Sequence, residues 1–424
     1  MKKLDVISLL LATLLIVACS QDSEPLPRAR DINVLIFANS REEAFIRAQI
    51  EDFQRFNWNA KVRLLVRPPD FSALAELERM ESKGQPVDLL YFESRELFPL
   101  VAKAKLAQIG KDHDIRKISE GILPELNKKL AIKNEQYSLP FAWSTAVLVF
   151  NKKIFDGIGI SYPSEYWGWP DVLESAQAAA MDTDRDGKID QYGMEMQSRA
   201  DEVMMMFWQF EGETRTDANS LTTLLNPENR LILDQTIDFY SDLQKGMNVA
   251  TINSKGLKGG LFESGRAAVT FGQWSDVESL LQSNRRSLWQ IAPAPRGRDK
   301  ATVLEAKLFA VAQDSVHKTE AIALAQFFLR SEAQKLLLEE GVGLPVLTAL
   351  NERTLTEGKE MGIDMQSFYL QLPDAQIAPQ NIVMKEIQKV LDDRLSSGHK
   401  IVTSPEDKPS FRSRLKLRLE SEKK

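Results

Sequence analysis

Short apolar runs alternate with longer amphipathic stretches over the first part of the chain. Residues 33–38, 61–66 and 87–92 read as strands, while residues 41–56 and 71–83 read as helices. A strand that is apolar throughout fits a sheet that is covered on both faces. Strands that alternate with helices in this way predict a doubly wound α/β lobe.

The alternation continues beyond residue 140. A further strand is expected at residues 146–151 and a helix at residues 169–180. Four more helices are expected at residues 231–245, 318–331, 332–340 and 380–396. A chain of 424 residues favours two or more lobes over a single core. We therefore expect more than one α/β unit, joined by short crossings.

The N-terminus, residues 1–18, reads as a secretory signal peptide. Lys2 and Lys3 precede an apolar run over residues 6–17, as in a positive n-region followed by a short apolar segment. This run is too short for a permanent membrane span, which needs roughly 20 residues. It ends in Leu-Ile-Val-Ala before Cys19, which is the only cysteine. The ending resembles the lipobox at which bacterial lipoproteins are cleaved and acylated.

An acylated Cys19 implies a protein held at a membrane on its extracytoplasmic face. The thiol would carry diacylglycerol through a thioether, with a fatty acid such as palmitate in the anchor; a free thiol is the alternative. Residues 19–30 contain two prolines and are expected to form a lipidated tether. We expect the body to lie outside the cell membrane, which is the periplasmic side in a diderm cell.

The composition argues against several classes of function. The net charge of −6 argues against a nucleic-acid partner. His113, His317 and His399 are scattered, and the sequence contains neither a glycine-rich phosphate loop nor a nucleophile elbow. We therefore expect no enzymatic activity and no required cofactor.

Eight segments, in order along the chain, carry a family resemblance. The longest is residues 137–152, which read YSLPFAWSTAVLVFNK. The others are residues 159–163 (GISYP), 167–173 (WGWPDVL), 262–269 (FESGRAAV), 272–274 (GQW), 291–295 (IAPAP), 321–329 (AIALAQFFL) and 343–345 (GLP). This ordered set resembles the family 1 extracellular solute-binding proteins, which are carbohydrate-type receptors of ABC importers.

The resemblance implies a two-lobed, type II periplasmic-binding-protein fold with a hinge and a ligand cleft between the lobes. The first lobe would hold residues 31–142 and 300–345, and the second residues 143–299 and 346–424. A monomer would close on a sugar or oligosaccharide and deliver it to the permease subunits of an ABC importer. Two rivals are a receptor that presents its ligand to a membrane sensor and a polysaccharide hydrolase, which would need two carboxylates about 5–10 Å apart.

A sugar site needs flat aromatic faces and polar groups. By resemblance, Trp143, Trp208 and Trp274 are candidates for the aromatic faces, with core packing as the alternative. Ligands of open α/β sheets bind beyond the carboxyl ends of strands. The candidates at the ends of the first and third expected strands are Asn39, Ser40, Phe92 and Glu93. The alternative is core packing for Phe92 and capping for Asn39 and Glu93.

One segment departs from the resemblance. Residues 304–309 read LEAKLF, where relatives usually have a glycine-rich strand. The glutamate and lysine in this segment are expected to alter the cleft.

An acidic loop at residues 182–193 (DTDRDGKIDQYG) matches the start of an EF-hand calcium loop. Such loops use oxygen ligands at positions 1, 3, 5 and 9, a glycine at position 6 and a backbone carbonyl at position 7. The expected ligands are Asp182, Asp184, Asp186, the carbonyl of Lys188, Asp190 and, by resemblance to relatives that use the tenth position, Gln191. Gly193 replaces the usual glutamate at position 12. A structural Ca²⁺ is expected here, with a solvated acidic turn as the alternative.

Overall fold

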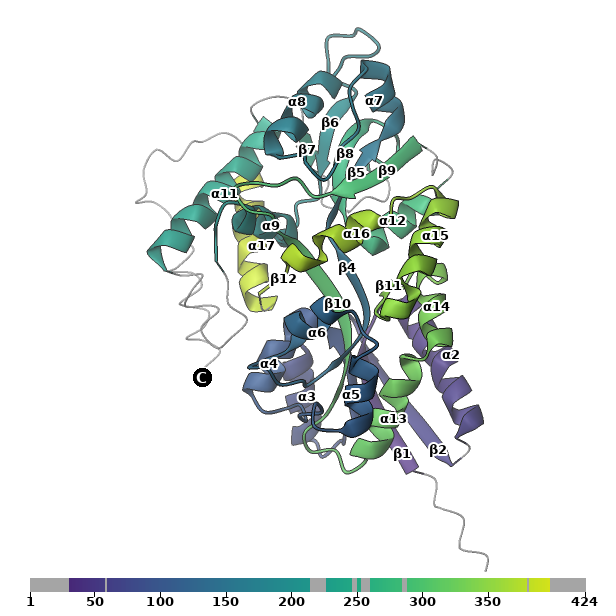
Figure 1. Cartoon of the computed structure of the whole chain (residues 1–424). Coiled ribbons are helices and arrows are strands. Elements are labelled where there is room, and N and C mark those ends of the chain that lie inside the picture. The colour runs from purple at the N-terminus through teal and green to yellow at the C-terminus, as the bar shows by residue number, and fades with distance from the viewer. Residues whose placement is uncertain are drawn as a thin grey trace, which may run out of the picture.

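The computed structural model shows two α/β lobes, one above the other in Figure 1. The structure describes residues 30–57, 59–213, 226–245, 250–252, 260–283, 288–379 and 381–396. The expected signal peptide, Cys19 and almost all of the tether lie outside the described residues.

The lower lobe in Figure 1 is built on a seven-stranded sheet. Its strands are β1 (Arg30–Phe37), β2 (Ala60–Arg67), β3 (Leu89–Glu93), β4 (Leu139–Thr145), β10 (Thr302–Val311), β11 (Leu344–Pro345) and β12 (Ala375–Ile377). Their order is β11-β4-β10-β3-β1-β2, with β12 paired to β10. The first three strands are parallel, whereas β10 runs antiparallel to β3 and β4. A distant segment of the chain therefore fills the middle of this sheet.

Helices flank the seven-stranded sheet (Figure 1). They are α2 (Ser40–Phe56), α3 (Ala73–Ser82), α4 (Leu97–Ala102), α5 (His113–Ser119), α6 (Pro124–Leu130), α13 (Lys318–Phe328) and α14 (Ser331–Glu339). Local chemistry sets their ends. Asn39 caps α2, and Ser72 caps α3 by accepting the backbone N–H of Ala75, because the first N–H groups of a helix have no partner within it.

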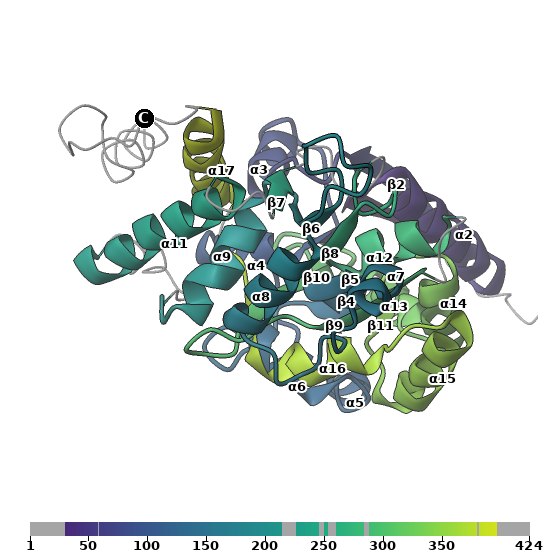
Figure 2. The same cartoon turned by 90° about the horizontal axis from the view of Figure 1, so that it is seen from above.

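The upper lobe is built on a five-stranded sheet in the order β7-β6-β8-β5-β9. Its strands are β5 (Val147–Asn151), β6 (Tyr192–Met196), β7 (Ala250–Ile252), β8 (Ala267–Gly272) and β9 (Trp289–Pro293). The remaining helices are α7 (Lys152–Ile158), α8 (Trp169–Ala179), α9 (Ala200–Gln209), α11 (Pro227–Lys245), α12 (Trp274–Leu281), α15 (Asn351–Met361), α16 (Gln366–Gln371) and α17 (Asn381–Ser396). In both views α11 and α17 lie together, away from α14 and α15 (Figure 2).

Two segments run directly from one sheet to the other. Ala146 separates β4 from β5, and residues 294–301 join β9 to β10. The side chain of Gln371 binds both segments: it donates to the carbonyl of Ala146 at 3.2 Å and accepts the backbone N–H of Ala294 at 2.7 Å. The hydroxyl of Thr302 also donates to the Ala146 carbonyl, at 2.7 Å. The crossings are thus tied together at one place.

The buried apolar residues form two clusters. The larger one surrounds the seven-stranded sheet, where Phe141 and Phe309 lie edge to face with ring centres 5.2 Å apart. It also takes in Trp274 and Ile291 from the elements of the upper lobe. The clusters therefore do not divide the chain at the expected lobe boundaries, which stay a prediction.

None of the helices within the described ranges has the length and apolar character that crossing a membrane requires.

Candidate functional site

A cavity of about 310 Å³ lies where the two sheets approach each other. Its wall comes from the residues after β1, from the last residue of β3, from β4 and β10, from the start of α12 and from residues 341–343. Elements of both lobes therefore face one space. This volume is at the lower end of the range of about 300–1,000 Å³ that is usual for small-molecule sites.

Asn39 and Glu42 form the wall beyond the end of β1. The side-chain oxygen of Asn39 accepts the backbone N–H groups of Arg41 and Glu42, each at 3.0 Å. The carboxylate of Glu42 accepts the backbone N–H of Asn39 at 2.9 Å in return, so the pair is a capping box that begins α2. The other oxygen of Glu42 accepts the hydroxyl of Tyr91 at 3.3 Å. Both oxygens of this buried carboxylate are thus already held by the chain.

Lys307 lies at the centre of the charged wall. Its ammonium group is 2.9 Å from the carboxylate of Glu93 and 3.2 Å from those of Glu42 and Glu305. Glu305 and Lys307 are two positions apart on β10 and so project from the same face. The register of the sheet sets Lys307 opposite Glu93, on the neighbouring strand β3. Strand pairing, rather than proximity in sequence, therefore assembles this group.

Arg95 extends the same network toward the other lobe. Its guanidinium is 2.9 Å from the carboxylate of Glu93 and 3.9 Å from that of Asp201 at the start of α9. We call the six connected charged residues the Lys307 cluster. Its members are Glu42, Glu93, Arg95, Asp201, Glu305 and Lys307.

Burial and neighbouring charges act in opposite directions in this cluster. Burial raises the pKa of Glu93, but the charges of Lys307 and Arg95 outweigh it and hold that pKa at about 2. Burial lowers the pKa of Lys307, but the surrounding carboxylates raise it well above its usual value. For Glu305 burial prevails over the attraction of Lys307, and its pKa is raised. The chain thus compensates the charge of Glu305 less well than that of Glu93.

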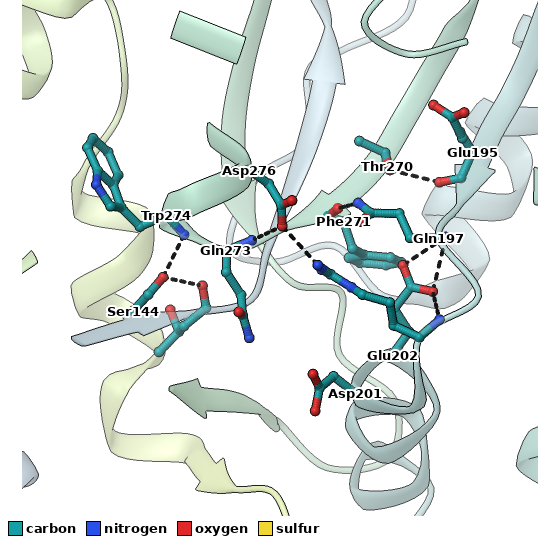
Figure 3. Close-up of polar contacts among 12 residues, drawn as sticks. Ser144, Glu195, Gln197, Asp201, Glu202, Thr270, Phe271, Gln273, Trp274 and Asp276 are labelled. Atoms are coloured by element: carbon teal, nitrogen blue, oxygen red, sulfur yellow. Dashed lines mark hydrogen bonds and ion pairs between the residues drawn. The ribbon is translucent and has the colours of Figure 1, made fainter. Parts of the chain in front are cut away.

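The wall on the side of the upper lobe comes from the turn between β8 and α12 (Figure 3). The backbone N–H of Trp274 donates to the hydroxyl of Ser144 at 2.8 Å. The carboxylate of Asp276 accepts the backbone N–H of Gln273 at 3.0 Å and the guanidinium of Arg199 at 3.1 Å. These bonds fix the start of α12 against β4 and α9. They hold the cavity-lining side chains of Ser144 and Gln273 in place.

A second ion pair joins the lobes at the rim of the cavity. Arg41 on α2 pairs with Glu278 on α12. Gly341 lies beside this pair with a φ of +66°, and a Cβ atom there would be 2.5 Å from Nη1 of Arg41 and 2.7 Å from Cδ of Glu278. The close approach of these two side chains therefore depends on a residue without a side chain at position 341.

Four of the seven residues expected to bind ligand line the cavity. They are Asn39, Glu93, Trp143 and Trp274. Ser40 does not line it, and the ring of Phe92 is fully buried in the core of the lower lobe. Trp208 borders a separate, open hollow together with Asp299 and Asp374. The structure therefore brings the first four together and leaves the other three outside.

The two tryptophans of the cavity are engaged in packing. Trp143 donates its indole N–H to the carbonyl of Pro345 at 2.8 Å and lies edge-on to Tyr369, with ring centres 5.1 Å apart. Trp274 lies edge-on to Phe368 at 6.1 Å. Each tryptophan is only 1% exposed. In this conformation both rings are buried by packing, and the expected stacking of sugar on them stays a prediction.

The sequence interpretation missed several residues of the wall. They include Arg41, Glu42, Ser144 and Gln273. One signal was available: Glu42 stands three positions after Asn39, as a capping box requires. Glu305 and Lys307, the charged residues of the divergent segment 304–309, were expected to alter the cleft, and both line the cavity.

The acidic loop brings three carboxylates together. Ligand oxygens of Asp182, Asp184 and Asp186 all lie within 4.8 Å of one another. The carboxylate of Asp182 accepts the backbone N–H groups of Arg185 at 2.6 Å and of Gly187 at 2.7 Å. Oxygen ligands in this number and arrangement fit a hard cation such as Ca²⁺.

The other expected calcium ligands make bonds of their own. The carboxylate of Asp190 accepts the backbone N–H and the hydroxyl of Thr183, at 2.8 and 2.6 Å. The side-chain N–H of Gln191 donates to the carbonyl of Ala179 at 2.8 Å. A Cβ atom at Gly193 would lie 1.9 Å from the carbonyl oxygen of Ala176. The packing of α8 on β6 thus explains why position 12 has no glutamate.

Comparison with known proteins agrees with this architecture. The model of the family described as bacterial extracellular solute-binding protein matches residues 48–361.

Three solved structures illustrate the similarity of fold. An ABC substrate-binding protein from Listeria monocytogenes, in complex with cycloalternan, aligns with a TM-score of 0.68 and 18% identity over 92% of this chain and 97% of its own. A solute-binding protein from Thermotoga lettingae, bound with α-D-tagatose, aligns at 0.67 and 18% over 88% and 95%. The GacH receptor of Streptomyces glaucescens, determined unliganded and with acarbose, aligns at 0.69 and 16% over 93% and 97%.

These structures share the two-lobed type II periplasmic-binding-protein fold that the sequence predicts. The family model covers most of the chain, from α2 to the end of α15. The chain therefore belongs to the bacterial extracellular solute-binding proteins.

Proposed function

We propose that this protein is a lipid-anchored receptor that captures a saccharide between its lobes and delivers it to an ABC importer. The observation that carries the proposal is the cavity between the lobes, to which β10 and α12 both contribute. A ligand held there touches both lobes, so its binding energy favours the closed arrangement. The permease then recognises the closed form of the receptor.

A saccharide suits the chemistry of the wall. Carboxylates, an amide and a hydroxyl line the cavity through Glu93, Glu305, Gln273 and Ser144. Such groups exchange hydrogen bonds with sugar hydroxyls. The similar structures described above contain cycloalternan, tagatose and acarbose.

The saccharide proposal is tested by a thermal-shift screen of mono- and oligosaccharides, with amino acids as the comparison class. A ligand at about 100 times its Kd stabilises a protein by roughly 2.7 kcal/mol, and we expect at least one saccharide to reach this. Small-angle X-ray scattering should then show a smaller radius of gyration with ligand. A screen in which only amino acids shift the melt would contradict the proposal.

A transport assay distinguishes delivery to an importer from presentation to a sensor. Deleting the partner permease abolishes uptake of the labelled ligand if the importer proposal holds. A receptor for a sensor kinase leaves uptake unchanged and abolishes a transcriptional response instead.

Hydrolysis of the ligand is the enzymatic rival. It needs an acid and a base placed on either side of the scissile bond. Glu42, Glu93 and Glu305 all contact the one ammonium group of Lys307 from elements of the lower lobe, which suits binding better than hydrolysis. We expect mass spectrometry to recover the bound saccharide intact after prolonged incubation.

The anchor proposal rests on Cys19, and the measurement is fractionation. Replacing Cys19 by alanine removes the thiol that acylation needs, so the variant is expected in the soluble extracytoplasmic fraction or as an uncleaved precursor. Unchanged, processed protein in the membrane fraction would refute the anchor.

We also propose a structural Ca²⁺ in the acidic loop, held by Asp182, Asp184 and Asp186 with the carbonyl of Lys188. The ion would offset the mutual repulsion of three carboxylates that lie within 4.8 Å. Removing calcium with EDTA should lower the melting temperature, and adding calcium should restore it. The variant Asp184→Asn should be insensitive to both treatments. An unchanged melt of the wild type in EDTA argues for a solvated turn.

A further inference from the structure

The Lys307 cluster carries more negative than positive charge. Its two cations, Lys307 and Arg95, face four carboxylates, those of Glu42, Glu93, Asp201 and Glu305. Lys307 and the three glutamates belong to the cavity wall, and the other cation of the wall, Arg41, is paired with Glu278. Unbalanced charge that is shielded from water is costly unless a partner compensates it. The cluster therefore has an excess of negative charge that a positive group of a ligand would compensate.

Glu305 is the carboxylate best placed to receive that group. Both oxygens of Glu42 are engaged in the capping box and with Tyr91. Glu93 is shared between Lys307 and Arg95. Within the described residues, the ion pair of Glu305 is with Lys307, through one oxygen at 3.2 Å, and the Glu305 side chain is 22% exposed. One oxygen of Glu305 is thus left for the contents of the cavity.

The geometry argues against two other kinds of charged ligand. Within the described ranges, three acidic side chains bring their oxygens within 4.8 Å of one another in the acidic loop. The carboxylates of the cavity do not form such a group. A metal ion is therefore disfavoured here. An anionic sugar is disfavoured too, because the three N–H bonds of the Lys307 ammonium already face three carboxylates, and an added anion would enlarge the negative excess.

Resting on the saccharide-binding function proposed above, we propose that the cleft selects a sugar that carries an ammonium group, with the carboxylate of Glu305 as its counter-charge. An ammonium group bound at Glu305 adds the missing positive charge, while the hydroxyls of the sugar bind Ser144 and Gln273. Burial raises the pKa of Glu305, which agrees with a carboxylate that lacks sufficient compensation from its own chain.

The test is calorimetry on the purified protein with matched sugars. Glucosamine, galactosamine, mannosamine and the disaccharide of glucosamine are each compared with the neutral parent sugar and the N-acetyl derivative. Spermidine and ethanolamine serve as amines without a sugar. We expect at least one amino sugar to bind 10-fold or more tightly than both of its neutral counterparts.

Variants at Glu305 connect that preference to the proposed group. Glu305→Gln keeps the shape but removes the charge, and it should reduce the preference to less than about 3-fold. Glu305→Asp keeps the charge and should retain a preference for the amine. Glu360→Gln, at an exposed position of α15, is the matched control and should bind as the wild type does. Circular dichroism verifies that each variant is folded.

The outcomes separate the two proposals. A neutral sugar that binds as tightly as its amino analogue, or a preference that survives in folded Glu305→Gln, overturns the ammonium proposal and leaves the saccharide function standing. Binding of spermidine or ethanolamine without any sugar overturns the saccharide function. Absence of binding by the whole panel overturns the ammonium proposal, while the wider screen of mono- and oligosaccharides described above decides the saccharide function.

Discussion

At the scale of single residues, Gly341 lies against the ion pair of Arg41 and Glu278, which joins the two lobes. Its φ of +66° strains any residue with a side chain, and a Cβ would also collide with the pair of Arg41 and Glu278. We predict that Gly341→Ala lowers the free energy of unfolding by about 1–3 kcal/mol and weakens ligand binding. Chemical denaturation and calorimetry measure the two effects.

Gly362 offers the matched control for that change. It has a similar φ of +78°, but a Cβ there would meet no atom within 4 Å. Gly362→Ala therefore introduces the backbone strain without the collision, and it should cost about 1 kcal/mol and leave ligand affinity unchanged. Equal effects of the two variants on ligand affinity would show that the contact of position 341 with Arg41 and Glu278 does not affect binding.

Glu76 shows how a single carboxylate makes stability depend on pH. It lies 2.6 Å from Arg79 and 2.5 Å from Arg67. The hydrogen bond from Arg79 first, and that from Arg67 next, outweigh burial and hold the pKa of Glu76 at about 2. The shift would be worth about 3 kcal/mol without screening, and exposure of the arginines reduces this to about 1 kcal/mol.

Because the pKa of Glu76 is depressed in the folded state, its stabilisation is complete above its ordinary pKa of 4.5 and is lost as pH falls through about 2. We predict that Glu76→Gln is less stable than the wild type at pH 7 by about 1 kcal/mol, and that the difference shrinks toward pH 2. Urea denaturation across this range measures it. The exposed control Glu360→Gln should show no such trend, and a difference for Glu76→Gln that is constant with pH would contradict the assignment.

At the scale of elements, the sequence pattern predicted the local units well. The expected strands at 33–38, 61–66 and 87–92 correspond to β1, β2 and β3, and the expected helix at 41–56 is α2. Strand β10 was not predicted as such, although it is the longest strand of the fold described here. Its charged residues Glu305 and Lys307 interrupt the apolar run that marks a buried strand. Pairing of β10 with β3 sets Lys307 opposite Glu93, which compensates the charge of Lys307.

Gln371 joins the two segments that cross between the sheets, and it does not line the cavity. We predict that Gln371→Met costs about 1–3 kcal/mol, because the N–H of Ala294 and the carbonyl of Ala146 lose a buried partner. Hydrogen exchange at the Ala294 amide should become faster. Gln366→Met, on the exposed side of α16, is the control. Unchanged exchange in Gln371→Met would mean that another contact protects the crossing.

At the scale of the whole molecule, two ion pairs span the cleft. Arg41 pairs with Glu278, and Arg95 with Asp201. We predict that Glu278→Gln shifts the molecule toward an open form by about 1 kcal/mol. The radius of gyration without ligand should increase, and salt should produce the same change in the wild type because it screens the pair.

The control for this prediction is an ion pair that does not join the lobes. Glu357 pairs with Arg353 at 2.5 Å, and both residues lie on α15, so Glu357→Gln removes a partly exposed pair within a single helix. Its scattering curve should match that of the wild type. If both variants scatter alike, the pair of Arg41 and Glu278 does not hold the lobes together.

The sequence alone determined the α/β class, because strand and helix periodicity act over a few positions, while the two-lobed fold, Trp143 and Trp274 followed from the family resemblance. Asn39 and Glu93 were found because they follow strands, where ligands of such sheets bind. Only the tertiary structure decided the charge of the cavity. Glu93 and Lys307 are 214 positions apart, and no local pattern shows that β10 enters the sheet beside β3. The register of that pairing sets one ammonium group among three carboxylates.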